Sequence, residues 1–376
     1  MGINPLSLAW LRFPVESSLG RRFPEPAHVY RNPFQRDRDR ILHSRAFRRL
    51  ENKTQVFAPG LSDHFRNRLT HTLEVTQIAR TLAAVLELDP DLTEALALVH
   101  DIGHPPFAHA GEDELNRQMQ SYGGRFDHNM HSLRIVESFE TRYALFPGLN
   151  LTFEVREGMV KHSRDFQLGE IKELDAYLPG QRPPLEAQLI DLADETAYNS
   201  SDLDDAHSAG LFRIEEAAAE VDALREIFEG IEISYPAAQP RIQFLECLGR
   251  LVNLLVTGIA EGTNQAVRKA GVQTIAEIRA HPGRLVQYSE RASIANRQLK
   301  AFLSKRVYYS PILLAERSQA VKRIADLFQF YMQYPGRLPE PHRMQATQAP
   351  KHQVVCDYIA GMTDGFCGKL HLELID

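Results

Sequence analysis

The sequence predicts an all-α protein, with a helical core and an elaborated helical C-terminal half. Two observations support this prediction. Apolar residues recur in several segments at the three- and four-residue spacing of an amphipathic helix. No run alternates between apolar and polar residues for long enough to build a central sheet. Breakers such as Pro147-Gly148 and Pro282-Gly283 separate the helical segments, as is typical of turns between helices.

The expected helices follow one another along the chain. The first apolar stripe lies within 69–86, and the run 92–99 is almost wholly apolar. Later stripes lie within 133–139, 185–193, 217–228 and 313–331. The long apolar stretch 242–260 contains Glu246 and Arg250, which favours a core helix over a membrane span. Because no long linker or internal repeat divides these segments, we expect residues 1–376 to form a single all-α domain.

The composition is that of an ordinary globular protein. Of 376 residues, 43% are hydrophobic and 24% are charged, and the formal net charge is −6. This balance argues against a global basic field that would attract nucleic acid. Cys247, Cys356 and Cys367 match neither a disulfide framework nor a zinc finger, which indicates a reducing compartment. Since no apolar leader opens the chain, we expect a cytoplasmic protein with no membrane partner.

One segment departs from this acidic balance. Residues 31–53 contain eight basic and three acidic side chains. An anionic ligand would suit this segment. A solvated basic helix with internal ion pairs would explain it equally well.

The most informative stretch is 100–112, which opens with the pair His100 and Asp101. These neighbours offer a metal ion one imidazole nitrogen and one carboxylate oxygen. They follow an apolar run, so we expect them at the end of a buried helix. Burying an ionised carboxylate is costly without compensation, and a divalent metal ion is a usual compensation.

Other residues can complete a metal site. His71 lies on an apolar helix, where a hydrogen-bonded core histidine is the alternative interpretation. Asp191 and Asp194 lie in the helix that starts near residue 185, and either could supply a buried carboxylate. A mixed nitrogen and oxygen shell suits one ion of Mn, Mg, Co, Fe or Ni with open positions for water and phosphate. No thiolate takes part, which disfavours a structural zinc site.

His109 and Glu112 are three residues apart, which puts them on one face if a helix begins near Ala110. A carboxylate beside an imidazole raises its basicity and fixes its tautomer. A histidine that protonates a leaving oxygen needs this arrangement. A helix-capping contact would explain Glu112 but not His109.

Longer blocks resemble the HD-domain phosphohydrolase superfamily, and closely the bacterial deoxyguanosinetriphosphate triphosphohydrolase-like family. The matching blocks follow in family order over most of residues 30–210, and the C-terminal half is similar more loosely. The blocks include Tyr30-Arg31-Asn32-Pro33, Ala46-Phe47-Arg48-Arg49, Arg66-Asn67-Arg68, His100-Asp101-Ile102-Gly103-His104, Phe126-Asp127-His128-Asn129, Asp194-Glu195-Thr196-Ala197-Tyr198 and Asp202-Leu203-Asp204-Asp205. The resemblance implies an HD metal-binding core at residues 60–210 within the single domain.

The resemblance also implies roles for individual residues. Asp194 is preferred to Asp191 as the metal carboxylate because Tyr198 and Asp202 follow it at the family's offsets. Gln55 would contact the sugar 3′-hydroxyl. Tyr198 would crowd out a ribose 2′-hydroxyl, although a half-buried core tyrosine is the plainer interpretation. The full sets are the metal ligands His71, His100, Asp101 and Asp194; the catalytic residues His109, Glu112 and His128; and the substrate-binding residues Gln55, Arg68, His104, Lys161, Tyr198 and Asp202.

The activity that the resemblance implies is metal-dependent hydrolysis of deoxynucleoside triphosphates to a deoxynucleoside and inorganic triphosphate. It also implies a homo-oligomer, a tetramer or a hexamer, with a nucleotide or single-stranded DNA as effector. Another HD-superfamily nucleotide phosphohydrolase or phosphodiesterase is one alternative. A non-catalytic nucleotide-binding regulator is a second alternative, which the intact metal set and the pair of His109 and Glu112 disfavour.

Overall fold

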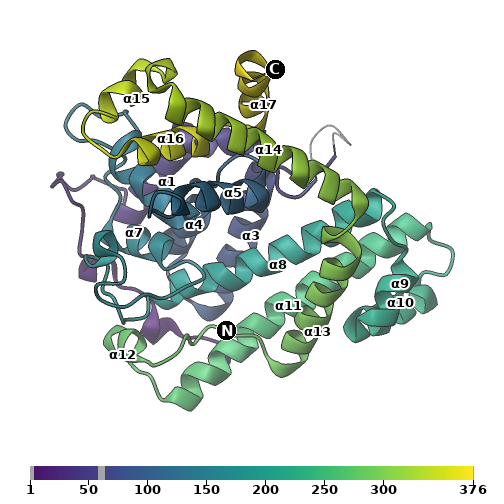
Figure 1. The fold of residues 1–376 in the computed structure, drawn as a ribbon. Coiled ribbons are helices and arrows are strands. Elements are labelled where there is room, and N and C mark those ends of the chain that lie inside the picture. The colour runs from purple at the N-terminus through teal and green to yellow at the C-terminus, as the bar shows by residue number, and fades with distance from the viewer. Residues whose placement is uncertain (1–3, 58–63, 376) are drawn as a thin grey trace. The chain divides into compact units, whose positions relative to one another are not determined.

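The computed structural model describes residues 4–57 and 64–375 and confirms the all-α prediction (Figure 1). Over these residues, β pairing is limited to two isolated bridges, Arg21 with Thr152 and Thr54 with Asn67. The α-helices are α1 (Pro33–Leu42), α2 (Arg45–Arg49), α3 (Arg68–Leu86), α4 (Pro90–Val99), α5 (Ala108–Gln120), α6 (His128–Arg134), α7 (Phe153–Val160), α8 (Leu185–Ser208), α9 (Ile214–Glu220), α10 (Asp222–Ser234), α11 (Pro240–Ala270), α12 (Ile275–Ala280), α13 (Glu290–Leu303), α14 (Pro311–Gln333), α15 (Glu340–Gln345), α16 (Lys351–Ala360) and α17 (Asp364–Leu374).

The helices group into two compact units, each assembled from three stretches of chain. Unit 1 contains Met1–Arg38, His71–Ala97 and Thr152–Ser310, and unit 2 contains Asp39–Thr70, Leu98–Leu151 and Pro311–Asp376. The proposed HD core at 60–210 therefore contributes to both units, and its first residues fall in 58–63, outside the described residues. The assignment of residues 1–376 to a single domain stays a prediction.

Unit 1 is built around two long helices, α8 and α11, which pack side by side (Figure 1). One face of α11 is buried through residues that include Phe244, Leu251 and Leu255. Gly258 lets α13 approach closely, since a Cβ there would lie 2.2 Å from the Cβ of Ala292. The α11 helix is long and apolar enough to cross a membrane, but core helices of soluble proteins meet the same criteria of length and composition. Its packing on α8, α10 and α13 agrees with the predicted core helix.

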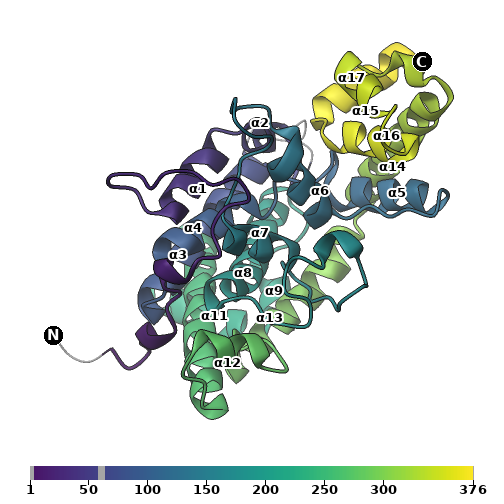
Figure 2. The same cartoon turned by 90° about the vertical axis from the view of Figure 1, so that its left-hand side faces the viewer.

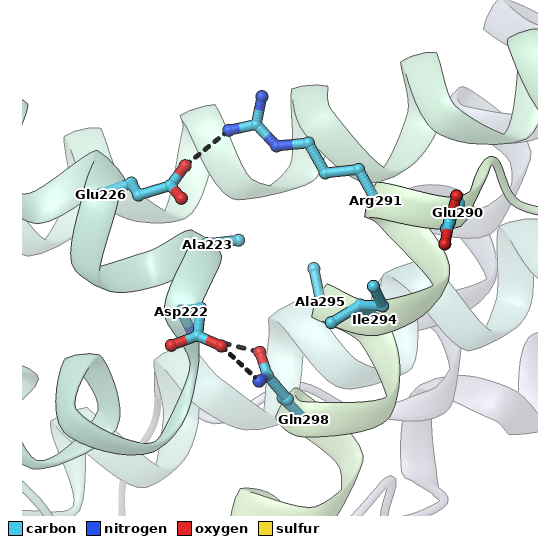
Figure 3. Close-up of a pocket in the computed structure, with 8 residues that line it drawn as sticks. All are labelled: Asp222, Ala223, Glu226, Glu290, Arg291, Ile294, Ala295 and Gln298. Atoms are coloured by element: carbon cyan, nitrogen blue, oxygen red, sulfur yellow. Dashed lines mark hydrogen bonds and ion pairs between the residues drawn. The ribbon is translucent and has the colours of Figure 1, made fainter.

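The predicted helix at 217–228 is split into α9 and α10. Val221 separates them with an extended backbone, φ −120° and ψ 102°, and its side chain is fully buried. Side chains then join α10 to α13: Arg291 pairs with Glu226 at 2.7 Å, and the Gln298 amide donates to Asp222 at 2.7 Å (Figure 3). The pocket between these two helices contains none of the predicted site residues.

Unit 2 brings α5 and α6 together with the C-terminal helices α14 to α17 (Figure 2). The α5 helix packs on α14 and α16, and its Leu115 and Met119 join Phe328 and Ile359 in one apolar core. The α5 helix carries the predicted catalytic residues His109 and Glu112. Apolar packing thus fixes this helix against the C-terminal helices.

A buried carboxyl, that of Glu186 in the first turn of α8, joins three segments of unit 1. Its Oε1 accepts the backbone N–H groups of Phe13 at 2.9 Å and Asp89 at 3.0 Å. Its Oε2 is buried and has no hydrogen-bond partner among the described residues. Burial raises the pKa of Glu186 to about 7, although the two backbone hydrogen bonds oppose this shift. The protonated carboxyl therefore fits this position.

We expect the free energy of unfolding to fall as pH rises, because the Glu186 carboxyl must lose its proton in a buried site. The contribution is fully present below the ordinary pKa of 4.5 and is lost as pH passes through about 7. The separation corresponds to about 3 kcal/mol. Glu186→Gln keeps the accepting oxygen and should flatten the dependence in urea unfolding between about pH 5 and pH 8. An unchanged slope in the variant would contradict this assignment.

Candidate active site

The pair of His100 and Asp101 lies directly after α4 and is buried in unit 2. Arg68 Nη1 donates to Asp101 Oδ2 at 2.6 Å. On the other carboxylate oxygen, Oδ1, His104 Nδ1 lies at 3.0 Å and His100 Nε2 at 3.4 Å. Burial alone would raise the pKa of Asp101, but the charges of His100, His104 and Arg68 hold it well below its ordinary value. Asp101 is therefore an anion surrounded by nitrogen donors.

Gly103 holds this turn against α6. A Cβ at Gly103 would lie 2.2 Å from the backbone oxygen of His128 and 2.3 Å from Ser132 Oγ. The ring of His131 lies at hydrogen-bond distance from the Gly103 oxygen, with Nδ1 at 2.8 Å. A larger residue would therefore displace the turn that carries His100 and Asp101.

A cluster of imidazoles surrounds Glu112 of α5. Glu112 Oε1 accepts the backbone N–H of His128 at 3.0 Å and lies 2.8 Å from His128 Nδ1. His109 Nδ1 lies 3.9 Å from Oε2, and the rings of His104 and His128 stack with centroids 3.9 Å apart. Burial would raise the pKa of Glu112, but its contacts with His109 and His128 hold that pKa far below its ordinary value. The predicted pair of His109 and Glu112 is present, and His128 makes the shorter contact.

Gln55 offers a buried amide without a complete set of partners. Its side chain is 5% exposed, and its Oε1 has no hydrogen-bond partner among the described residues. An unpaired buried amide oxygen costs free energy unless water or a ligand supplies a donor. This oxygen is suited to accept a hydrogen bond from a ligand hydroxyl.

Unit 1 carries His71 on α3 and Asp194 on α8, with His71 Nε2 at 2.8 Å from Asp194 Oδ1. The structure adds His162, which the sequence analysis did not assign. His162 Nδ1 lies 2.9 Å from Asp191 Oδ1, and Nε2 lies 3.4 Å from Asp194 Oδ2. Arg284 also donates to Asp191. Asp191 is thus engaged by a guanidinium and an imidazole, and Asp194 by two imidazoles; the choice of Asp194 as the metal carboxylate stays a prediction. The one sequence feature that could have indicated His162 is its position next to Lys161, a predicted substrate-binding residue.

A face of α8 carries Tyr198 and Asp202 beside a second tyrosine, Tyr308. The Tyr308 hydroxyl donates to Asp202 Oδ2 at 2.6 Å, and the rings of Tyr198 and Tyr308 lie 6.0 Å apart. The ring of His71 lies 6.4 Å from that of Tyr198. His71 therefore lies near both Asp194 and Tyr198, which are one helical turn apart on α8. Tyr308 lies in a π-helical turn, Ser304–Tyr308, and no sequence motif pointed to it.

Lys161 is buried inside unit 1 with its three N–H donors engaged. Its Nζ lies 2.7 Å from Glu157 Oε1, 2.9 Å from the Leu178 oxygen and 2.9 Å from the Gln181 oxygen. Arg279 binds the same Glu157 carboxylate through two hydrogen bonds, at 2.7 and 3.0 Å. These contacts are those of a buried structural network.

Comparison with known proteins places these motifs in a wider group. The HD domain model matches residues 68–199, and the phosphohydrolase-associated domain model matches residues 286–373. A deoxyguanosinetriphosphate triphosphohydrolase-like protein of Azoarcus sp. (strain BH72) is 45% identical over 358 residues, which is 95% of this chain and 93% of the relative. Proteins of the same name are 42% identical in Geobacter sulfurreducens and 44% identical in Ralstonia nicotianae, covering 90% and 92% of those relatives and 93% and 95% of this chain.

We expect Lys161→Met to lower the free energy of unfolding by about 2 kcal/mol, because two buried carbonyl oxygens and one carboxylate lose their donor. Chemical denaturation measures the change. Lys172→Met is the matched control, since Lys172 is exposed and its replacement should change stability by about 0.5 kcal/mol or less. Equal stability of the two variants would show that the Lys161 contacts contribute little.

Proposed function

Because this chain belongs to the deoxyguanosinetriphosphate triphosphohydrolase-like family of HD-domain phosphohydrolases, we propose that it hydrolyses deoxynucleoside triphosphates to a deoxynucleoside and inorganic triphosphate. The observation that supports this most is the complete set of HD positions, His71, His100, Asp101 and Asp194, all inside the matched HD segment. Each of these positions holds a nitrogen or oxygen donor. A chain that had lost catalysis would have no reason to keep all four.

These four residues would hold one divalent metal ion. Two imidazoles and two carboxylates form a donor set that suits Mn, Mg, Co, Fe or Ni. His71, His100 and Asp101 are buried, so their donors are shielded from bulk water. When bound, the ion supplies positive charge next to a phosphate and lowers the pKa of a bound water.

Arg68 would hold the polyphosphate, together with His104. Its guanidinium presents a planar fork that matches phosphate oxygens, and its bond to Asp101 places it beside the metal carboxylate. A phosphate role for Lys161 stays a prediction, because binding there would require its internal hydrogen bonds to exchange. The arginines of the 31–53 segment remain candidates for further cationic contacts.

Proton delivery would come from the Glu112 cluster. We assign His109 as the group that protonates the 5′ oxygen of the leaving deoxynucleoside, since its side chain is 64% exposed and can meet a substrate. The carboxylate of Glu112 would orient the imidazole that delivers the proton. His128 is the alternative donor, because it makes the shorter contact with Glu112.

Sugar recognition would use Gln55, Tyr198 and Asp202. Gln55 Oε1 would accept the 3′-hydroxyl, which would pair its buried oxygen. Tyr198, backed by Tyr308, would leave no room for a ribose 2′-hydroxyl, and Asp202 would be held in place by its bond from Tyr308. A homo-oligomeric assembly, an effector nucleotide or single-stranded DNA, and a cytoplasmic location stay predictions.

The bond that breaks tests the function directly. Each deoxynucleoside triphosphate should give deoxynucleoside and intact triphosphate in the presence of Mn or Mg, and none after chelation. In oxygen-18 water the label should appear on triphosphate and not on the nucleoside, because water attacks phosphorus and the 5′ oxygen leaves. Formation of monophosphate with pyrophosphate would instead identify a different nucleotide phosphohydrolase.

Variants of the imidazole cluster test the proton donor. His109→Gln should lower kcat by about two to four orders of magnitude, the usual contribution of a general acid, with metal content unchanged. Glu112→Gln should lower it less, because the imidazoles remain. His352→Gln is the control, since this histidine stacks on Tyr122 away from the cluster. If His128→Gln loses activity and His109→Gln retains it, His128 is the donor.

A further inference from the structure

Asp364, the first residue of α17, binds two loops of unit 2 that are distant in the sequence. Its Oδ2 accepts the backbone N–H of Thr54 at 2.8 Å. Its Oδ1 accepts the backbone N–H of Phe107 at 3.0 Å. An acidic residue at a helix start is usually explained by its own helix dipole. Here the capping bond of α17 comes from Thr363, and both Asp364 oxygens are directed to other segments.

Both loops carry residues of the proposed site. Thr54 directly precedes Gln55, whose buried amide oxygen would accept the sugar hydroxyl. Phe107 lies two residues before His109 in the sequence and three after His104. One carboxylate therefore sets the separation between the loop for sugar binding and the loop for proton delivery.

The backbone at Phe107 needs such a restraint. Phe107 and Ala108 both adopt left-handed conformations, with φ of 63° and 53°. For residues other than glycine this conformation costs about 1–2 kcal/mol each. These two residues set the direction in which α5 leaves the turn, and His109 is the second residue of α5. A charge-assisted hydrogen bond to the Phe107 N–H opposes relaxation of the turn.

A second group of contacts joins the same two loops to the end of α16 and the turn before α17. Lys53 is buried, and its Nζ donates to the backbone oxygen of His104 and, at 3.2 Å, to that of Ala360. Arg49 donates to the oxygen of Gly361 at 2.9 Å. The turn between α16 and α17 is therefore hydrogen-bonded to the segment before Gln55 at several points, and the segment after His104 is linked to both.

We propose that Asp364 is a positioning residue for this enzyme, which fixes the Gln55 loop and the His109 loop through one backbone hydrogen bond each. The phosphohydrolase-associated segment then has a defined task, since it supplies the carboxylate that aligns two parts of the site. The catalytic consequence rests on the proposed function, whereas the restraint on the two loops does not.

Amide hydrogen exchange and kinetics together test this proposal. In Asp364→Ala, the peptides that contain Thr54 and Phe107 should exchange at least about ten-fold faster, because both N–H groups lose their acceptor. The kcat on deoxynucleoside triphosphates should fall about 100-fold, as expected when reacting groups are displaced by about 1 Å. Asp364→Asn keeps the size and one oxygen acceptor, so one loop should stay protected and the loss of kcat should be smaller.

Asp326→Ala is the matched control. Asp326 binds His371 of α17 at 2.8 Å, so its loss loosens the same helix without removing a bond to either loop. It should leave exchange at Thr54 and Phe107, and kcat, near the wild-type values. Circular dichroism checks that each variant is folded, and Asp364→Asn provides the test if the alanine variant is not.

The outcomes separate this proposal from the proposed function. Unchanged exchange at both loops in the folded Asp364 variants would overturn the proposal whatever the activity. Faster exchange with an unchanged kcat would show that Asp364 has only a structural role, and would also overturn it. A wild-type protein that releases no triphosphate would refute the proposed function, and the exchange experiment would still decide whether Asp364 restrains the two loops.

Discussion

The buried negative charge of Asp101 is the constraint on which the candidate site depends. A carboxylate at the end of an apolar helix can stay ionised only if cations and hydrogen-bond donors replace the water that it lost. In unit 2 this replacement comes from Arg68, His100 and His104. The turn that carries His100 and His104 lies directly against α6, where a side chain at Gly103 would clash with His128 and Ser132.

Local surroundings give buried carboxyl groups of this protein opposite charge states. Glu186 receives two backbone N–H groups on one oxygen and no charged partner of opposite sign among its principal contacts, so burial raises its pKa and favours the protonated form. Glu112 is surrounded by imidazoles, which hold it ionised despite its burial. The first carboxyl fastens the start of α8 in the core, and the second stays charged beside His109 and His128. Burial therefore does not by itself identify a functional acid, whereas the groups around it do.

The C-terminal helices also have a place in this arrangement. They share an apolar core with α5. Ala360 at the end of α16 and Asp364 at the start of α17 accept hydrogen bonds from the loops before Gln55 and after His104. The C-terminal segment contains no predicted site residue. Its hydrogen bonds nevertheless reach the loops that carry three predicted site residues, Gln55, His104 and His109. Residues of both the HD segment and the phosphohydrolase-associated segment therefore fix the loop positions in unit 2.

The amino-acid sequence by itself determined the helical class, the helical stripe within 69–86 that became α3, and the buried end of α4 at His100 and Asp101. Each of these follows from spacing along one helix, which local periodicity encodes. The break at Val221 was not predictable, because the apolar stripe continues through it and tertiary packing selects the extended backbone. Only the tertiary structure brought His128 to Glu112, His162 to Asp194, Tyr308 to Asp202 and Asp364 to the two loops. These partners lie 16 to 310 residues apart along the chain. No periodic pattern relates residues at such separations, so the packing of the helices alone decides which of them meet.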